Sequence, residues 1–256
     1  MNKIIFDYLF GFGSTPDEFS PGIIPNLTAW FDATILSSIT RDVSDKVSQW
    51  DDLSGNGNHA TQNTATLQPT YAIQQINGKP AISYNGSTQR LLVNSLLSGG
   101  QARTIFIVAR SDETTIHNAL FNFSQTHTGD GTHFAVIAYW HTHTACAVFL
   151  GGNKRFDESL SGGDSGIITS MLPQNGTIND TRMFKDGHEL DSIGSNKSTT
   201  AVNTQASGCF IGYGPFTNAN LNGGIGEILV FDRELDSSEL LSIHQYLSDK
   251  WGVTLA

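Results

Sequence analysis

The chain has 256 residues, a length that suits one large β domain with its own hydrophobic core. Its 24 acidic and 14 basic side chains give a formal net charge of −10, which argues against a nucleic-acid partner because phosphate binding needs a clustered basic face. No apolar run approaches the roughly 20 residues of a membrane-spanning helix, so we expect no membrane span. Only 15% of residues are charged, whereas Gly, Asn, Ser and Thr are plentiful, as is typical of many strands joined by turns.

Residues 1–13 form an apolar arm. Asp7 interrupts its apolar run and no small-residue cleavage site follows, so we do not interpret it as a signal peptide. An apolar patch of this size usually marks an interface, and we expect the arm to bind another protein; the alternative is that it folds back onto its own domain. The anchoring candidates are its large apolar side chains Ile5, Phe6, Tyr8, Phe10 and Phe12.

Residues 14–25 contain three of the seven prolines and are predicted to form an extended linker. The chain thus divides into an arm and linker (1–25) and a domain (26–256).

Strand patterns dominate the domain. They cover residues 27–31, 46–50, 80–84, 103–109, 119–123, 133–140, 144–150, 166–172, 181–185, 188–193, 208–213 and 225–231. The run 103–109 is apolar on both faces, as in a central strand covered on both sides. Asn77-Gly78 is a turn signal before the strand 80–84, and Asp186-Gly187 is a two-residue hairpin signal. Turns at regular spacing favour an antiparallel sandwich.

A helix is predicted after the last strand. Asp236 occupies the N-cap position and Glu239, three residues later, completes a capping box. An apolar stripe follows at helical spacing: Leu240, Ile243, Leu247 and Trp251.

Several segments together carry a resemblance to a known family. They are Trp30-Phe-Asp-Ala33, Trp50, Asp52-Leu-Ser-Gly-Asn-Gly-Asn-His-Ala60, Gln68-Pro-Thr-Tyr71, Asn77-Gly-Lys-Pro-Ala-Ile-Ser-Tyr-Asn-Gly86 and the strand–helix ending 221–252. In these the chain resembles the laminin-G-like (concanavalin A-like) jelly-roll domains common in bacterial surface proteins and phage virion proteins. The resemblance covers residues 26–256 and implies an all-β, antiparallel jelly-roll β-sandwich with a short C-terminal α-helix. It is specific for fold and weak for function.

The resemblance, joined with the arm, implies a non-catalytic virion protein of a phage, either a capsid decoration protein or a tail adhesin. Its expected partners are other virion proteins, bound through the arm, and host-surface glycans; a homo-oligomer, for which a trimer is one option, is expected. The alternative is a bacterial surface or secreted carbohydrate-binding module that depends on Ca²⁺. A glycoside hydrolase is less favoured, because Glu227 and Asp232 lack the spacing of paired catalytic carboxylates.

Residues 51–58 gather carboxylates and amides around two glycines. Asp51, Asp52, Asn56 and Asn58 are candidate Ca²⁺ ligands, since Ca²⁺ prefers hard oxygen donors and related domains often bind it. The alternative is a turn whose Asx side chains satisfy the local backbone.

His141 and His143 lie on one face of a strand or strand end and could bind a transition metal, in a site that a trimer would complete. The alternative is two polar histidines at a strand edge.

The loop 212–223 offers two rings and nearby amides. Tyr213, Phe216, Asn218 and Asn220 are candidate glycan-binding residues, because aromatic faces stack on sugars and amides bond to hydroxyls. The alternative is a packed loop with buried rings. Cys146 and Cys209 lie in apolar strands and fit free buried thiols, although a disulfide between them stays open.

Overall fold

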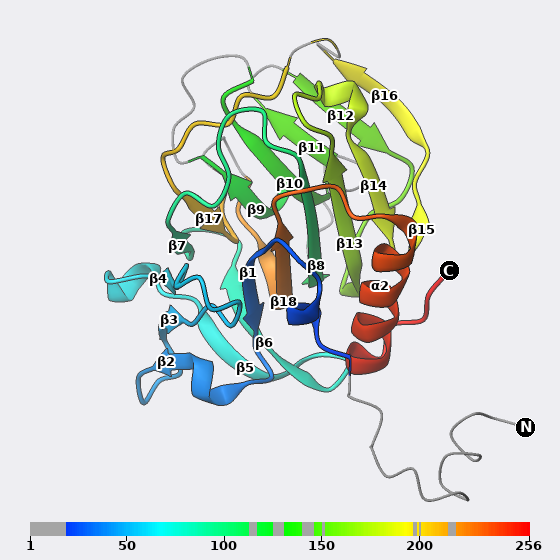
Figure 1. Cartoon of the computed structure of the whole chain (residues 1–256). Helices are drawn as coiled ribbons and strands as arrows, with labels where there is room; N and C mark the ends of the chain where they lie inside the picture. The colour runs from blue at the N-terminus through cyan, green and yellow to red at the C-terminus, as the bar shows by residue number, and fades with distance from the viewer. Residues whose placement is uncertain are drawn as a thin grey trace, which may run out of the picture.

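The computed structural model describes residues 19–112, 117–124, 131–139, 146–149, 152–196, 199, 201–214 and 219–256. These residues form two antiparallel sheets that pack face to face, and one helix covers the outer side of the first sheet (Figure 1). The fold class predicted from the sequence, an antiparallel jelly-roll sandwich with a C-terminal helix, is confirmed.

The first sheet, sheet A, has β8 (Arg103–Ser111) and β18 (Asn222–Phe231) at its centre. On the β8 side follow β13 (Asp164–Leu172), β14 (Arg182–Lys185) and β15 (His188–Glu189). On the β18 side lie β6 (Lys79–Asn85) and β5 (Thr70–Ile76), and β1 (Leu27–Asp32) pairs with the remaining length of β18.

The second sheet, sheet B, has ten strands. In spatial order they are β16 (Ser192–Asn196), β12 (Gly152–Phe156), β11 (Cys146–Phe149), β10 (Phe134–Tyr139), β9 (Asn118–Phe123), β17 (Cys209–Ile211), β7 (Leu91–Val93), β4 (Ala60–Thr61), β3 (Val47–Trp50) and β2 (Ile39–Arg41). Short 3-10 turns occupy Pro21–Ile23 (η1), Leu36–Ser38 (η2), Ala65–Leu67 (η3) and Ile178–Asp180 (η4).

The strand β8 separates two hydrophobic clusters. Ile105, Ile107 and Ala109 face the core between the sheets, whereas Phe106 and Val108 face the helix α2 (Ser237–Trp251). All five side chains are fully buried. The prediction of a central strand covered on both faces is therefore confirmed, with sheet B on one side and α2 on the other.

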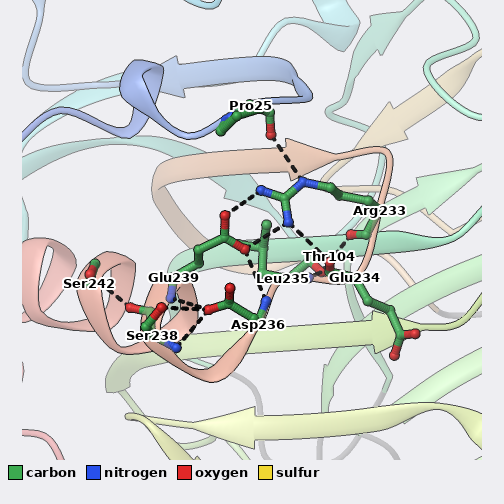
Figure 2. A network of polar contacts seen from close by, with 9 residues as sticks. All are labelled: Pro25, Thr104, Arg233, Glu234, Leu235, Asp236, Ser238, Glu239 and Ser242. Atoms are coloured by element: carbon green, nitrogen blue, oxygen red, sulfur yellow. Dashed lines mark hydrogen bonds and ion pairs between the residues drawn. The ribbon is translucent and has the colours of Figure 1, made fainter.

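The start of α2 is fixed by the predicted capping box (Figure 2). Asp236 Oδ1 accepts hydrogen bonds from the backbone N–H groups of Ser238 and Glu239, at 2.8 and 3.0 Å, and Glu239 Oε2 accepts from Asp236 N at 3.0 Å. Arg233 holds the Glu239 carboxylate from the other side with two hydrogen bonds of 2.6 and 2.7 Å. The predicted apolar stripe of α2 is buried against sheet A.

Both predicted turns form. Asn77 and Gly78 have φ angles of 47° and 76°, and Asp186 and Gly187 have φ angles of 50° and 83°. Positive φ at both central residues is the signature of the tight turn that matches strand twist.

Three expectations need correction. Residues 188–193 form two strands in different sheets, because the chain crosses from sheet A to sheet B at the buried Leu190. The strand predicted to end at 213 ends at Ile211, because Gly212 has a φ of 75°. The short strands β2, β4, β7 and β12 and the longer strand β5 were not predicted.

The structure also places the end of the expected linker against the domain. Ile24 belongs to the cluster under α2, and Phe19 packs on Tyr246 with ring centroids 5.8 Å apart. Cys209 is a buried free thiol, in line with the sequence-based interpretation. Among the described residues, no helix is both long and apolar enough to cross a membrane.

Candidate functional site

Two loops meet at one end of the sandwich. The first, residues 86–90, joins β6 to β7, and the second, residues 212–221, joins β17 to β18. Gly86 N donates a hydrogen bond of 2.8 Å to Leu221 O, and Asn220 Nδ2 donates to Ser87 O. Residues 215–218 of the second loop lie outside the described residues.

Gly212 allows the second loop to leave β17 sharply. A Cβ atom at this position would lie 2.4 Å from the Tyr84 ring, and the φ angle of 75° is rare for other residues. The turn brings Tyr213 next to Phe210, three residues earlier.

Arg90, Phe210 and Tyr213 form a stacked group on the outer face of sheet B. The neighbours of Phe210, Cys209 and Ile211, belong to the inter-sheet core, so Phe210 itself faces outward. The Phe210 and Tyr213 ring centroids lie 5.1 Å apart with an interplanar angle of 67°. Arg90 Cζ lies 4.7 Å from the Tyr213 centroid and 5.9 Å from that of Phe210.

We call Arg90, Phe210, Tyr213 and Asn220 the Tyr213 cluster. Arg90, Tyr213 and Asn220 are partly exposed, whereas Phe210 is buried beneath them. A guanidinium stacked on a ring restrains both groups and leaves a flat, amphipathic surface. Such a surface can pack against the C–H face of a sugar ring.

A polar rim surrounds the cluster. Asn85 Oδ1 accepts hydrogen bonds from Ser87 N and Thr88 N, both at 3.0 Å, which shapes the first loop and leaves both hydroxyl-bearing side chains exposed. Within the described part of the chain, Asn220 Oδ1 and Arg90 Nε have no hydrogen-bond partner, but both atoms are buried, so the exposed polar groups of this rim are those of Ser87 and Thr88. An aromatic floor with donors and acceptors at its edge is the usual composition of a carbohydrate site.

The structure thus brings together two of the four predicted glycan-binding residues. Tyr213 and Asn220 lie in one loop and both reach the first loop, through Arg90 and Ser87 respectively. Phe216 and Asn218 lie outside the described residues. Sequence reasoning missed Arg90 and Phe210. The pairing of β7 with β17 places Arg90 beside Tyr213, whereas Phe210 lies only three residues before Tyr213 in the chain.

The four candidate calcium ligands lie in one turn, which runs along the edge of β1. Asp52 Oδ1 accepts from Trp30 N and Ser54 N, both at 2.9 Å, while Oδ2 accepts from Ser54 Oγ at 2.8 Å and Asn58 N at 2.9 Å. Four donors use the lone pairs that a carboxylate offers. The Asp52 oxygens therefore accept hydrogen bonds from the protein, whereas a Ca²⁺ site needs oxygens that are free to coordinate the ion.

The other candidates in this turn also contact the protein. Asn56 Nδ2 and Asn58 Nδ2 donate to Thr28 O at 3.2 and 2.9 Å, and Asp51 Oδ1 accepts from Gln49 Nε2 at 2.7 Å. This arrangement does not fit a preformed calcium loop. It fits the alternative, a turn held by its Asx side chains. Calcium binding stays a prediction that a melting curve with and without EDTA tests.

The remaining predicted site residues lie outside the described part of the chain. They are His141 and His143, the candidate metal ligands, and Ile5, Phe6, Tyr8, Phe10 and Phe12 of the arm. Among the described residues, no group of three His, Cys, Asp or Glu side chains could hold a metal ion.

A buried polar network joins α2 to sheet A. Glu227 Oε1 accepts from Trp30 Nε1 and Tyr246 OH, both at 2.8 Å, and Oε2 accepts from Trp251 Nε1 at 2.7 Å. Lys250 Nζ lies 2.7 Å from Glu227 Oε2 and 2.5 Å from Asp32 Oδ2. Burial raises the pKa of Glu227, the Asp32 carboxylate raises it further, and Lys250 opposes both effects.

A hollow lies on the opposite side of the molecule from the Tyr213 cluster, beside α2. Its volume is about 730 Å³, and its lining combines Phe19, Leu241 and Tyr246 with the polar ends of Lys79, Ser242, Gln245, Asp249 and Lys250. Lys250 and Tyr246 already bind Glu227 or each other. Two of its polar groups are therefore already engaged in contacts within the protein.

Comparisons with solved structures show the same fold in proteins of very different sequence. Domain 4 of AbnA, an extracellular GH43 arabinanase from Geobacillus stearothermophilus, solved in complex with arabinotriose, matches with a TM-score of 0.59 at 17% identity, over 86% of this chain and 98% of that one. The binding domain of Paraclostridial Mosquitocidal Protein 1 matches with a TM-score of 0.56 at 14% identity, over 91% of this chain and 56% of that one.

Trypanosoma rangeli sialidase, solved with the inhibitor DANA, matches with a TM-score of 0.59 at 13% identity, over 98% of this chain and 39% of that one. The chain thus spans about half or less of the last two proteins. No protein-family model matches the chain, and no curated protein sequence does. At these identities the likeness shows the fold alone, a jelly-roll β-sandwich.

Proposed function

We propose that the chain is a non-catalytic carbohydrate-binding β-sandwich domain whose binding surface is the Tyr213 cluster. The observation that carries this proposal is the Arg90–Tyr213 stack over Phe210, which is partly exposed and bordered by the Asn220 amide and the hydroxyls of the first loop. The arabinotriose bound to the similar arabinanase domain supports the ligand class.

The non-catalytic part of the proposal is supported by the buried carboxylates. Paired acids that hydrolyse glycosides must reach the bond that they cleave. Asp32 and Glu227 are each 1% exposed and share the Lys250 ammonium. A pair held in this way serves to position α2.

For the whole protein, we propose a phage virion component, either a capsid decoration protein or a tail adhesin, with the domain displayed outward. The resemblance to jelly-roll domains of virion proteins supports this role, as does the apolar composition of the arm. The alternative is a bacterial surface or secreted calcium-dependent module. A glycoside hydrolase remains the less favoured third option.

A glycan array followed by titration of its best ligand tests the carbohydrate proposal. Replacing Tyr213 by Ala removes the stacking surface, and we expect affinity to fall about fivefold or more, since a stacked ring contributes about 1 kcal/mol or more. Leu241→Ala is the matched control, because Leu241 is an exposed apolar residue of α2 on the other side of the sandwich. Equal affinities of both variants would contradict the assigned surface, and a silent array would contradict the function.

A further inference from the structure

Arg90 carries a positive charge without an acidic partner among the residues that the structure describes. Arg110, Arg182 and Arg233 each bind a carboxylate at 2.6 to 2.7 Å. Within the described part of the chain, no carboxylate lies within 4.0 Å of Arg90, although the sequence has 24 acidic residues and only 14 basic ones. Among the described residues, its guanidinium donates a single hydrogen bond, from Nη1 to Thr88 O, at 3.1 Å.

The stack on Tyr213 holds this guanidinium in a fixed plane. Arg90 Cζ lies 4.7 Å from the Tyr213 ring centroid, and the side chain is only partly exposed. A planar guanidinium presents two parallel N–H groups that match the two oxygens of a carboxylate. A guanidinium already held in place loses less freedom when it binds such a group.

Arg103 also lies over aromatic rings, but its role is purely structural. Arg103 Cζ lies 5.3 and 5.1 Å from the rings of Phe123 and Phe134, and its side chain is fully buried. Its donors reach Gln101 O and Thr204 Oγ1, at 3.0 to 3.2 Å. Arg90 has the same stacking but is partly exposed, and among the described residues its Nη2 group has no hydrogen-bond partner, whereas its Nε is buried.

We propose that the Tyr213 cluster selects an acidic sugar, in which the carboxylate of a uronic or sialic acid pairs with Arg90 while the sugar ring packs on Tyr213. The exposed Ser87 and Thr88 hydroxyls then bind sugar hydroxyls. This inference rests on the carbohydrate binding proposed above and adds the ligand class.

Isothermal titration with two pairs of matched glycans tests the selection. Trigalacturonate is compared with its uncharged methyl ester, and 3′-sialyllactose with lactose, so the uronate and sialate sources are separated. We expect at least one acid to bind about tenfold or more tightly than its neutral counterpart, as is typical of a charge-assisted hydrogen-bonded pair.

Variants of Arg90 assign the preference to its guanidinium. Arg90→Gln should reduce acid affinity to that of the neutral glycan, and Arg90→Lys should retain part of the preference, because it keeps the charge without the planar fork. Arg155→Gln is the control, since Arg155 lies on β12 of the same sheet and also has no carboxylate within 4.0 Å among the described residues. Melting temperatures of all three variants verify that they fold.

The outcomes separate this inference from the proposed function. Equal affinity for the acidic and the neutral glycan overturns the acidic selection, and so does an acid preference that survives in Arg90→Gln. If the glycans bind equally but Tyr213→Ala loses them, the cluster is still a carbohydrate site. If none of the four glycans binds, the acidic selection also fails, and the glycan array alone then decides whether another carbohydrate is recognised.

Discussion

His244 is a titratable side chain enclosed by apolar neighbours. It lies on α2 with its ring centroid 5.2 Å from that of Phe106 and 6.1 Å from that of Phe184, and its Nε2 lies 2.9 Å from Thr169 Oγ1. Burial lowers the pKa of His244 from 6.5 to about 4.

This pKa shift predicts a loss of stability in mild acid. As the pH falls from about 6.5 to about 4, the unfolded chain binds a proton that the folded chain does not, so the free energy of unfolding decreases, by up to about 3 kcal/mol. Urea unfolding at pH 7, 5.5 and 4.5 measures this decrease in the free energy of unfolding. The loss should be smaller in His244→Gln, while the control His188→Gln, an exposed histidine of β15, should behave like the wild type. Identical profiles for His244→Gln and wild type would contradict this account.

At the level of single residues, the sequence identified side chains suited to ligand binding, but it did not always reveal which groups they contact. Tyr213 and Asn220 were found because rings and amides in a glycine-rich loop are a local pattern. Arg90 is distant in the chain, and nothing beside it indicates a ring. Asp52 belongs to an oxygen-rich segment that resembles a calcium loop, yet its oxygens serve the backbone of β1 and its own turn.

At the level of elements, the network around Glu227 explains several residues of the family resemblance. Trp30 and Asp32 belong to β1, Glu227 to β18 and Trp251 to α2. These separated positions meet under the helix, where both indole N–H groups donate to the Glu227 carboxylate. Residues of the strand–helix ending therefore hold α2 against sheet A.

Lys250→Met should loosen this attachment. It leaves the Asp32 and Glu227 carboxylates buried without a cation, which should lower the free energy of unfolding by about 3 kcal/mol or more at pH 7. The loss should be smaller at pH 5, because Glu227, whose pKa is already raised by burial, can take up a proton.

Chemical denaturation at both pH values measures the effect of Lys250→Met. The control is Lys185→Met, which breaks an ion pair with the exposed Glu158 and should change stability by about 1 kcal/mol or less. Equal losses in the two variants would show that the buried network does not stabilise α2.

The elements that could be predicted are those with a strong local pattern. The long central strand β8, the two hairpin turns and the cap of α2 each depend on a few adjacent residues. β4 and β7 have only two and three residues, too few for a period to emerge. The chain divides into β15 and β16 because the first segment pairs in sheet A and the second pairs in sheet B. These tertiary contacts cannot be deduced from the sequence pattern.

At the level of the whole molecule, the two faces of the sandwich differ. The helix α2 covers the outer side of sheet A (Figure 1). The Tyr213 cluster lies on the outer face of sheet B, because Cys209 and Ile211 on either side of Phe210 face the inter-sheet core. The domain can therefore present the cluster to a ligand while the helix side faces elsewhere.

Deleting residues 1–13 tests the proposed attachment through the arm. We expect the shortened protein to keep its melting temperature, because the described core begins beyond this segment, and to fail to join the virion particles that contain the full chain. Particle incorporation is measured by sedimentation. Normal incorporation of the shortened protein would contradict the anchoring role.

The most direct test of the carbohydrate surface is an NMR titration of the ¹⁵N-labelled protein with its best array ligand. We predict that the amide signals that shift most belong to Ser87, Thr88, Tyr213 and Asn220 around the Tyr213 cluster. Shifts concentrated instead at Lys79, Leu241 and Gln245, beside α2, would contradict the account.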